Sequence, residues 1–357
     1  MSDQRRIPVT IKDIARSLDL AHSTVSRALN DHPSIGDATK LRVRSEAKRL
    51  GYFPDSSARI MRGSTSLLVG LIVPDIENEF YNAAAKAMTQ VCSLRGYQLV
   101  LSVSDDDPIQ EQRHVEALRG SKAAGIVIVP TAKPRARTAQ LLRDVPTVQF
   151  LRYAVSIGKI VVRADEGQGI FEAVQHLVGL GHKRIGYIGG PRGLSTGDSR
   201  VAGYERALKE GKLKEDVLMV CLGLPRPEFG YASLATLLDL ANPPTALVVA
   251  GSRQLLGALT AIAERKIDVP TQLSIVGYGD PAWFQICRPS ITAVALPVLE
   301  MATRAGNLLF ELMDSSAEAV RRPPEPAFMP QLIVRETSTS PSVVRPRHSR
   351  EKKSVRT

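Results

Sequence analysis

The hydrophobic positions of the chain follow two different patterns. In residues 9–50, apolar residues recur at helical spacing in short groups, as Ile11, Ile14 and Leu18 do, and each group ends at a turn. From residue 67 onward, short apolar runs such as LLVGLIV alternate with longer amphipathic segments. The first pattern predicts three short helices, and the second predicts buried parallel strands that are connected by helices.

The first two predicted helices are joined by a tight turn. Thr10 can cap the first helix, with Asp13 three residues later as the acidic member of a capping box. The turn runs through residues 19–21, and the second helix starts at His22 or Ser23.

The second helix has one apolar side and one side of small polar residues. Val25, Ala28 and Leu29 are expected to face the core, so that the outward side carries Ser23, Thr24, Ser26 and Arg27. A third helix is expected to be capped by Asp37 and to end at Gly51. The apolar positions that are expected to line it are Leu41, Val43, Ala47 and Leu50. Two short helices braced by a third predict a helix-turn-helix, whose second helix enters the major groove of DNA. A generic three-helix bundle is the alternative, but it does not account for the exposed hydroxyl groups.

The net charge of +11 is concentrated at the two ends of the 357-residue chain. Residues 1–62 hold 12 Lys and Arg against 7 Asp and Glu, and residues 341–357 hold 6 against 1. The region between them is close to neutral, which favours a polyanion such as nucleic acid as the partner of one end. For the C-terminal end, a solvated and disordered tail is the simpler interpretation.

The body of the chain repeats one cycle of strand and helix. SLLVGLIVP, YQLVLSVS and AAGIVIVP are expected to be strands with helices between them, and the cycle restarts after GKIVVRADEGQG. Two doubly wound units in succession predict a two-lobed α/β body with a cleft between the lobes.

The sequence lacks the motifs that would indicate several other classes of protein. The three cysteines, Cys92, Cys221 and Cys287, lie far apart and the six histidines have no metal spacing, so we expect no metal. GYIGGPRG lacks the spacing of a dinucleotide site, and neither a Walker loop nor a Gly-x-Ser-x-Gly elbow occurs, so we expect neither an enzyme nor a cofactor. The N-terminus has no signal-peptide pattern and LLVGLIV is too short for a membrane span, so a cytoplasmic protein without a membrane partner is expected, and not an exported solute-binding protein.

Several motifs together resemble the LacI/GalR family of bacterial transcriptional regulators. VTIKDIARSLDLAHSTVSRALN followed by RLGYFPDSSARIM is similar to the headpiece and hinge of that family. VPDIENEFY, GHKRIGYIGGP, VPTQLSIVGYGD and PQLIVRETS are similar to segments of its body, and the resemblance covers nearly all of residues 9–340. It implies an all-α helix-turn-helix headpiece followed by a body like that of periplasmic sugar-binding proteins. The function implied is that of a repressor that binds a pseudo-palindromic operator in double-stranded DNA as a homodimer.

The resemblance also implies which residues contact DNA. In the family a hinge helix folds on the operator and inserts a Leu into the minor groove, and Met61 stands at the matching position here. His22 and Ser23 fall at base-reading positions that vary within the family. The implied DNA-binding residues are Thr10, His22, Ser23, Thr24, Ser26, Arg27, Asn30, Ala58, Arg59 and Met61.

A small-molecule effector between the lobes is implied as well. The residues that match effector-binding positions are Phe80, Tyr81, Arg152, Asp165, Arg200, Ser252 and Asp280. On the residues alone, either aromatic could instead belong to the core, and Asp165 could be a helix cap. Ser252 and Gly279 stand where the family usually has Asp, and Arg253 lies close by. These departures favour a sugar acid or a sugar phosphate over a neutral sugar, or else a cleft that binds nothing.

These expectations divide the chain into four parts. The headpiece takes residues 1–53, the hinge helix and linker take 54–66, the body takes 67–340 and the basic tail takes 341–357. Within the body, the first lobe takes about 67–163 and 293–322, and the second takes about 164–290 and 323–340. The tail has no Leu heptads, so we expect a dimer and not the tetramer that some family members form.

Overall fold

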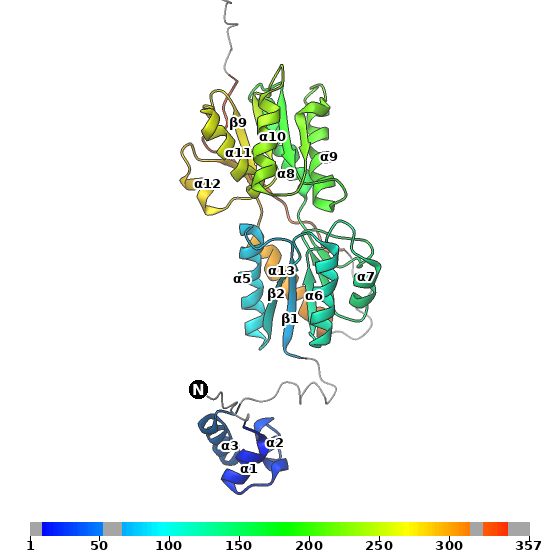
Figure 1. Cartoon of the computed structure of the whole chain (residues 1–357), viewed down its shortest axis with the longest axis vertical. Coiled ribbons are helices and arrows are strands. Elements are labelled where there is room, and N and C mark those ends of the chain that lie inside the picture. The colour runs from blue at the N-terminus through cyan, green and yellow to red at the C-terminus, as the bar shows by residue number, and fades with distance from the viewer. Residues whose placement is uncertain (1–8, 53–65, 315–323, 342–357) are drawn as a thin grey trace, which may run out of the picture. The chain divides into compact units, whose positions relative to one another are not determined.

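Two compact units make up the chain, with the boundary between Ser66 and Leu67. The computed structural model describes residues 9–52, 66–314 and 324–341. Figure 1 shows the first unit as a cluster of the helices α1, α2 and α3, and the second unit as two lobes, each with helices packed around a central sheet. The predicted hinge helix, with Ala58, Arg59 and Met61, and residues 342–357 of the predicted tail lie outside the described residues.

The first unit is built on one small apolar cluster. Helices α1 (Ile11–Leu18), α2 (His22–Leu29) and α3 (Asp37–Leu50) each contribute two buried residues to it. These residues are Ile14, Ala15, Val25, Ala28, Val43 and Ala47. The predicted capping box is present, because the N–H and the hydroxyl of Thr10 both donate to Asp13 Oδ2, at 2.8 and 2.7 Å. Asp19 then ends α1 in the left-handed conformation, with a φ of 52°, which Asp tolerates better than most residues.

Two details of α3 differ from the prediction. Leu41 does not line the core and is 70 % exposed, because it lies two residues, or about 200° of helical turn, before the buried Val43. The helix is capped by Gly36, and Asp37 is its first residue. The Asp37 carboxylate lies 3.8 Å from the Lys40 ammonium one turn later.

The first lobe of the body is a five-stranded parallel sheet in the order β2-β1-β3-β4-β5. Its central strands are continuous apolar runs, as expected for a sheet that helices cover on both faces. The strands are β1 (Leu68–Val73), β2 (Gln98–Val103), β3 (Gly125–Ile128), β4 (Thr147–Phe150) and β5 (Val161–Val162). The helices of this lobe are α5 (Glu79–Leu94), α6 (Pro108–Gly120), α7 (Ala136–Leu142) and α13 (Val298–Asp314).

The second lobe has six strands in the order β11-β10-β9-β8-β6-β7, and only the edge strand β11 is antiparallel to its neighbour. The strands are β6 (Ile185–Gly189), β7 (Val220–Leu222), β8 (Ala246–Val249), β9 (Ser274–Tyr278), β10 (Thr292–Ala295) and β11 (Gln331–Ile333). The helices are α8 (Glu166–Gly179), α9 (Ser195–Glu210), α10 (Pro227–Leu238), α11 (Ser252–Arg265) and α12 (Ala282–Ile286), with a 3₁₀ turn η1 (Val217–Met219) before β7. The predicted two-lobed α/β body is therefore confirmed.

The chain passes between the two lobes three times, and the second passage comes later than predicted. Residues 293–295 were expected in the first lobe, but β10 pairs with β9 in the second sheet because both strands are buried apolar runs. Only α13 returns to the first lobe, where it buries Met301, Ala302 and Ala305 in the apolar cluster. The third passage runs beside the first, and Phe328 forms a bridge with Ala164 there.

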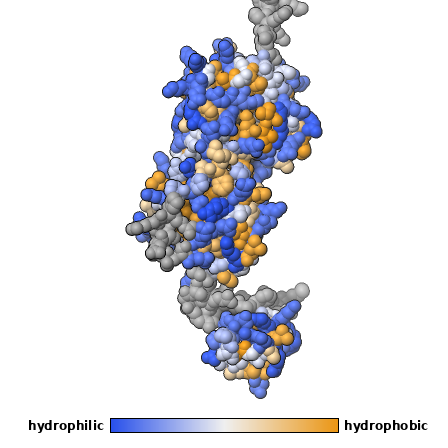
Figure 2. All heavy atoms as spheres, turned by 180° about the vertical axis from the view of Figure 1, so that it is seen from behind, coloured by the Kyte–Doolittle hydropathy of each residue, from blue (hydrophilic) through white to orange (hydrophobic). Residues whose placement is uncertain are grey.

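The face of the body seen from behind the view of Figure 1 is mostly polar. Figure 2 shows hydrophilic residues over most of this face, with apolar residues in separate patches. Individual apolar side chains are nevertheless well exposed, among them Leu94, Val155, Val217 and Ile286. Within the described ranges, no helix is both long and apolar enough to cross a membrane.

Candidate functional site

The outward face of α2 carries the polar residues that the sequence predicts for DNA contact. Val25 and Ala28 are fully buried beneath it, and this fixes the direction of the other side chains. Four of the predicted residues are exposed, namely His22, Ser23, Arg27 and Asn30. Thr24 and Ser26 are half-buried. Small hydroxyl groups around one long cation form a surface that can approach the edges of bases closely.

The Arg27 side chain has no hydrogen-bond or ion-pair partner in the described structure, in contrast to Lys40 and Arg44 of the same unit. Lys40 and Arg44 of α3 both lie 3.1 Å from Asp31. Hydrogen bonding to Lys40 is the main reason why the pKa of Asp31 falls below its usual range. Since these cations hold α3 against the end of α2, they serve the fold, whereas the Arg27 guanidinium keeps its donors for an external acceptor.

Two of the predicted DNA-contact residues also hold helix ends. The Thr10 hydroxyl donates to Asp13 at the start of α1, and Asn30 Nδ2 donates to the Ser26 carbonyl at the end of α2, at 2.8 Å. Both side chains are exposed, so these bonds do not remove them from the surface.

A cavity of about 650 Å³ lies between the two lobes. Its walls come mainly from the segments that follow β1, β4, β6, β8 and β9, at the carboxyl ends of the strands in both sheets. This is where ligands bind in open α/β sheets. Most of the lining side chains are aliphatic or aromatic, so a few polar groups determine which hydrogen bonds a ligand can form.

Six of the seven predicted effector residues line this cavity. They are Phe80, Tyr81, Arg152, Arg200, Ser252 and Asp280. Asp165 does not line it, because its carboxylate caps α8 by accepting from the Gln168 N–H at 3.0 Å. The alternative that the sequence left open for Asp165, a helix cap, is therefore the one that the structure has.

Arg200 is held on three sides by the second lobe. Its Nε donates to the buried Glu166 carboxylate, and its Nη1 donates to the Ala250 carbonyl at 2.6 Å. Its guanidinium lies 3.9 Å from the centre of the Tyr278 ring. Burial lowers the pKa of this guanidinium, but the adjacent carboxylate more than offsets that effect and raises it above the ordinary value.

The other charged groups around the cavity are paired within the chain as well. Arg152 Nη1 donates to Asp106 at 2.5 Å, and Asp280 accepts two bonds from Arg335, at 2.8 and 2.7 Å. Arg253 forms an ion pair with Glu77 at the mouth of the cleft. The expected preference for an anionic effector assumed guanidinium groups without counter-charges, and the structure provides a carboxylate for each of them.

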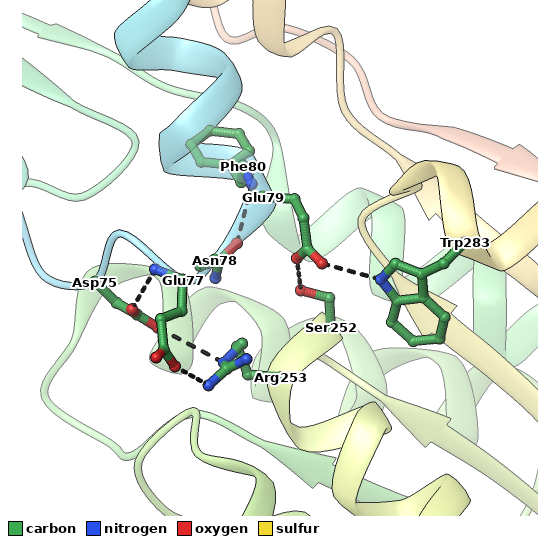
Figure 3. A network of polar contacts seen from close by, with 8 residues as sticks. All are labelled: Asp75, Glu77, Asn78, Glu79, Phe80, Ser252, Arg253 and Trp283. Atoms are coloured by element: carbon green, nitrogen blue, oxygen red, sulfur yellow. Dashed lines mark hydrogen bonds and ion pairs between the residues drawn. The ribbon is translucent and has the colours of Figure 1, made fainter.

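Two polar residues that were not predicted from the sequence reach into the cleft from opposite lobes. Glu79 begins α5 in the first lobe, and Trp283 lies in α12 of the second. Trp283 Nε1 donates to Glu79 Oε1 at 3.0 Å, and Figure 3 shows the carboxylate between this indole and Ser252. The available signals were the position of Glu79 next to Phe80 and the presence of a single tryptophan in the chain. In the part of the chain that the structure describes, no group of His, Cys, Asp or Glu could hold a metal ion.

Each of the two units contains a segment that matches the model of a known protein family. Residues 10–55 match the model of the bacterial regulatory proteins of the lacI family, and residues 174–338 match the periplasmic binding protein-like domain. The HTH-type transcriptional regulator GalR of Escherichia coli (strain K12) is 30% identical over 343 residues, which make up 95% of this chain and 98% of that protein. The chain belongs to the LacI family of bacterial regulatory proteins.

Other members of the LacI family match over similar lengths. The HTH-type transcriptional repressor PurR of Haemophilus influenzae (strain PittEE) is 28% identical over 333 residues, 93% of this chain and 99% of that protein. The lac repressor dimer bound to operator and the anti-inducer ONPF has the same fold, with a TM-score of 0.81, 22% identity and coverage of 93% and 100% of the two chains. A complex of the transcriptional regulator CelR with cellobiose has a TM-score of 0.69, 26% identity and coverage of 92% and 100%. The chain is thus a DNA-binding transcriptional regulator and not an enzyme.

Proposed function

We propose that this LacI-family regulator represses transcription by binding a pseudo-palindromic operator as a homodimer, and that a small molecule in the cleft controls the binding. The observation that carries the proposal is the surface of α2, where an unpaired guanidinium lies among small hydroxyl groups. Such a surface suits the major groove, because arginine donates bidentately to guanine and hydroxyl groups can contact bases or phosphates.

A dimer follows from the symmetry of such a site. One α2 helix covers one half-site, and two-fold related helices contact half-sites that lie about 34–36 Å apart on one face of DNA. The similar lac repressor structure is a dimer on its operator. Met61 in the predicted hinge is proposed as the apolar wedge that opens the minor groove between the half-sites.

Selection of bound sequences from a random double-stranded pool would test the DNA-binding part. The full chain should enrich an inverted repeat and bind it with one dimer per site in gel-shift titrations. Arg27→Ala should weaken specific binding by roughly 1–3 kcal/mol if the contact is to a base. Lys209→Ala is a charge-matched control, since Lys209 is an exposed residue of α9 in the body, and it should bind normally. Equal affinity for random and selected DNA at physiological salt would exclude the proposal.

The effector part is supported by the size and the walls of the cavity. About 650 Å³ is enough for a sugar-sized molecule, and a similar regulator is known in complex with cellobiose. On one wall Phe80 is half-buried and offers an aromatic side chain to a ligand, whereas Tyr81 is 5% exposed and belongs to the apolar cluster of the first lobe. A ligand that changes operator affinity in gel shifts and also raises the melting temperature of the body would support this part. A panel of sugars and sugar derivatives without either effect would count against it.

A further inference from the structure

The Glu79 carboxylate crosses the cleft from one lobe to the other. It belongs to the first residue of α5, and both of its hydrogen-bond donors belong to the second lobe. Trp283 Nε1 lies 3.0 Å from Oε1, and the Ser252 hydroxyl lies 3.4 Å from Oε2. Figure 3 shows the carboxylate pointing away from its own helix toward these two groups.

Glu79 is unlike the other carboxylates that line the cavity, because its partners are neutral. Asp106 and Asp280 each pair with an arginine at 2.8 Å or less, and Asp75 lies 3.9 Å from Arg253. Among the described residues, no cation forms an ion pair with Glu79. Asp75 shares Arg253 with Glu77, so Glu79 is the carboxylate among the described lining residues that has no cation as a partner.

The Glu79 carboxylate also keeps room for a further donor. A carboxylate has about four lone-pair sites, and the indole and the hydroxyl occupy two of them. Ser252 matters here because a hydroxyl can donate to Glu79, whereas an acidic side chain at position 252 would place two carboxylates against each other. The cavity therefore presents a charged acceptor, and the described residues that line it include no unpaired guanidinium that could bind an anion.

We propose that Glu79 sets the charge preference of the cleft, so that the effector offers a protonated amine or neutral hydrogen-bond donors at this point and is not a carboxylate or a phosphate. This inference rests on the proposed function, in which the cleft binds a small molecule. A ligand donor would take the free sites of the carboxylate, and an ammonium group would add an attraction that a hydroxyl group lacks. A carboxylate at the same point would be repelled.

The neighbouring Glu77 provides a matched control. It lies two residues before Glu79 and also reaches the second lobe, but it pairs with Arg253 and is 69% exposed at the mouth of the cleft. Glu77→Gln therefore removes one unit of charge close by without removing the acceptor at Trp283. Glu79→Gln keeps the size of the side chain and one acceptor oxygen while it removes the charge.

The single tryptophan of the chain provides the measurement, because Trp283 lies against Glu79 in the cleft. Its emission is titrated in the full-length protein with glucosamine, glucose and glucuronate, which share one ring and differ in charge, and calorimetry checks each affinity. Wild type should bind glucosamine about tenfold more tightly than glucuronate, with glucose between them. Glu79→Gln should reduce that ratio to about twofold, and Glu77→Gln should leave it near the wild-type value.

Several outcomes would overturn the inference. One is that glucuronate binds wild type as tightly as glucosamine does. The others are an unchanged ratio in Glu79→Gln and the absence of a saturable response to all three probes. Thermal unfolding of each variant verifies that it is folded before its ratio is compared. Binding of the wild-type protein to its operator is measured separately, without a probe. Absence of specific operator binding refutes the proposed function. Specific operator binding together with no charge preference in the cleft refutes this inference alone.

Discussion

Replacement of Arg200 by methionine would leave a buried carboxylate without its counter-charge. Glu166 is 3 % exposed, and the Arg200 Nε–H donates to its Oε2. Removal of one partner from a buried ion pair costs about 3–5 kcal/mol, because the remaining charge stays desolvated. The melting temperature of the body should therefore fall by roughly 6–20 °C.

A second substitution separates this charge effect from a loss of packing. Arg200→Met combined with Glu166→Gln removes both charges, and replacement of a buried ion pair by neutral groups is often close to neutral in stability. The double variant should thus recover most of the loss of the single variant. Calorimetric or circular-dichroism melts of the full chain measure both variants against wild type.

A loss below about 1 kcal/mol, or one that the Glu166→Gln background does not reduce, would refute the assignment of this pair as a buried charge.

Three further predictions concern stability elsewhere. Thr10→Ala should cost about 1 kcal/mol because it removes the hydroxyl that bonds Asp13, and hydrogen exchange of the α1 amides should speed up accordingly; unchanged exchange would contradict this. Leu41→Ala should change stability by less than about 0.5 kcal/mol, whereas Val43→Ala should cost roughly 2 kcal/mol in chemical denaturation, and equal effects would contradict the assigned faces of α3. Burial lowers the pKa of His182, so its folded-state pKa lies below its unfolded-state value and stability should fall as pH drops through the ordinary imidazole range. His182→Gln should weaken this dependence in melts at a series of pH values, and an unchanged dependence would assign the effect to other groups.

Local patterns predicted most of the fold because burial repeats with the geometry of each element. The helical spacing of Ile14, Val25 and Val43 identified the core of the first unit, and apolar runs identified the strands of both lobes. The prediction that Leu41 is buried was wrong, since hydrophobic character alone does not say on which side of a helix a residue lies. Its distance of two residues from Val43 would have placed it on the opposite face.

The charge of the cavity could not be predicted in the same way, because its ion pairs join distant parts of the chain. Arg152 is 46 residues from Asp106, and Arg335 is 55 residues from Asp280. Whether a guanidinium in a cleft is free or paired depends on such contacts, and no local pattern contains them. The sequence therefore located the walls of the cavity better than the groups that a ligand would meet there.

The three passages of the chain between the lobes have a consequence for synthesis on the ribosome. The first unit has its whole apolar cluster once residue 52 has been made. The first lobe lacks α13 until residue 314 has been made, and the second lacks β11 until residue 333. Domains fold as units during translation, so a nascent chain carries a finished DNA-binding unit ahead of two incomplete lobes. A product that terminates before α13 would lack the residues with which this helix covers the apolar cluster of the first lobe.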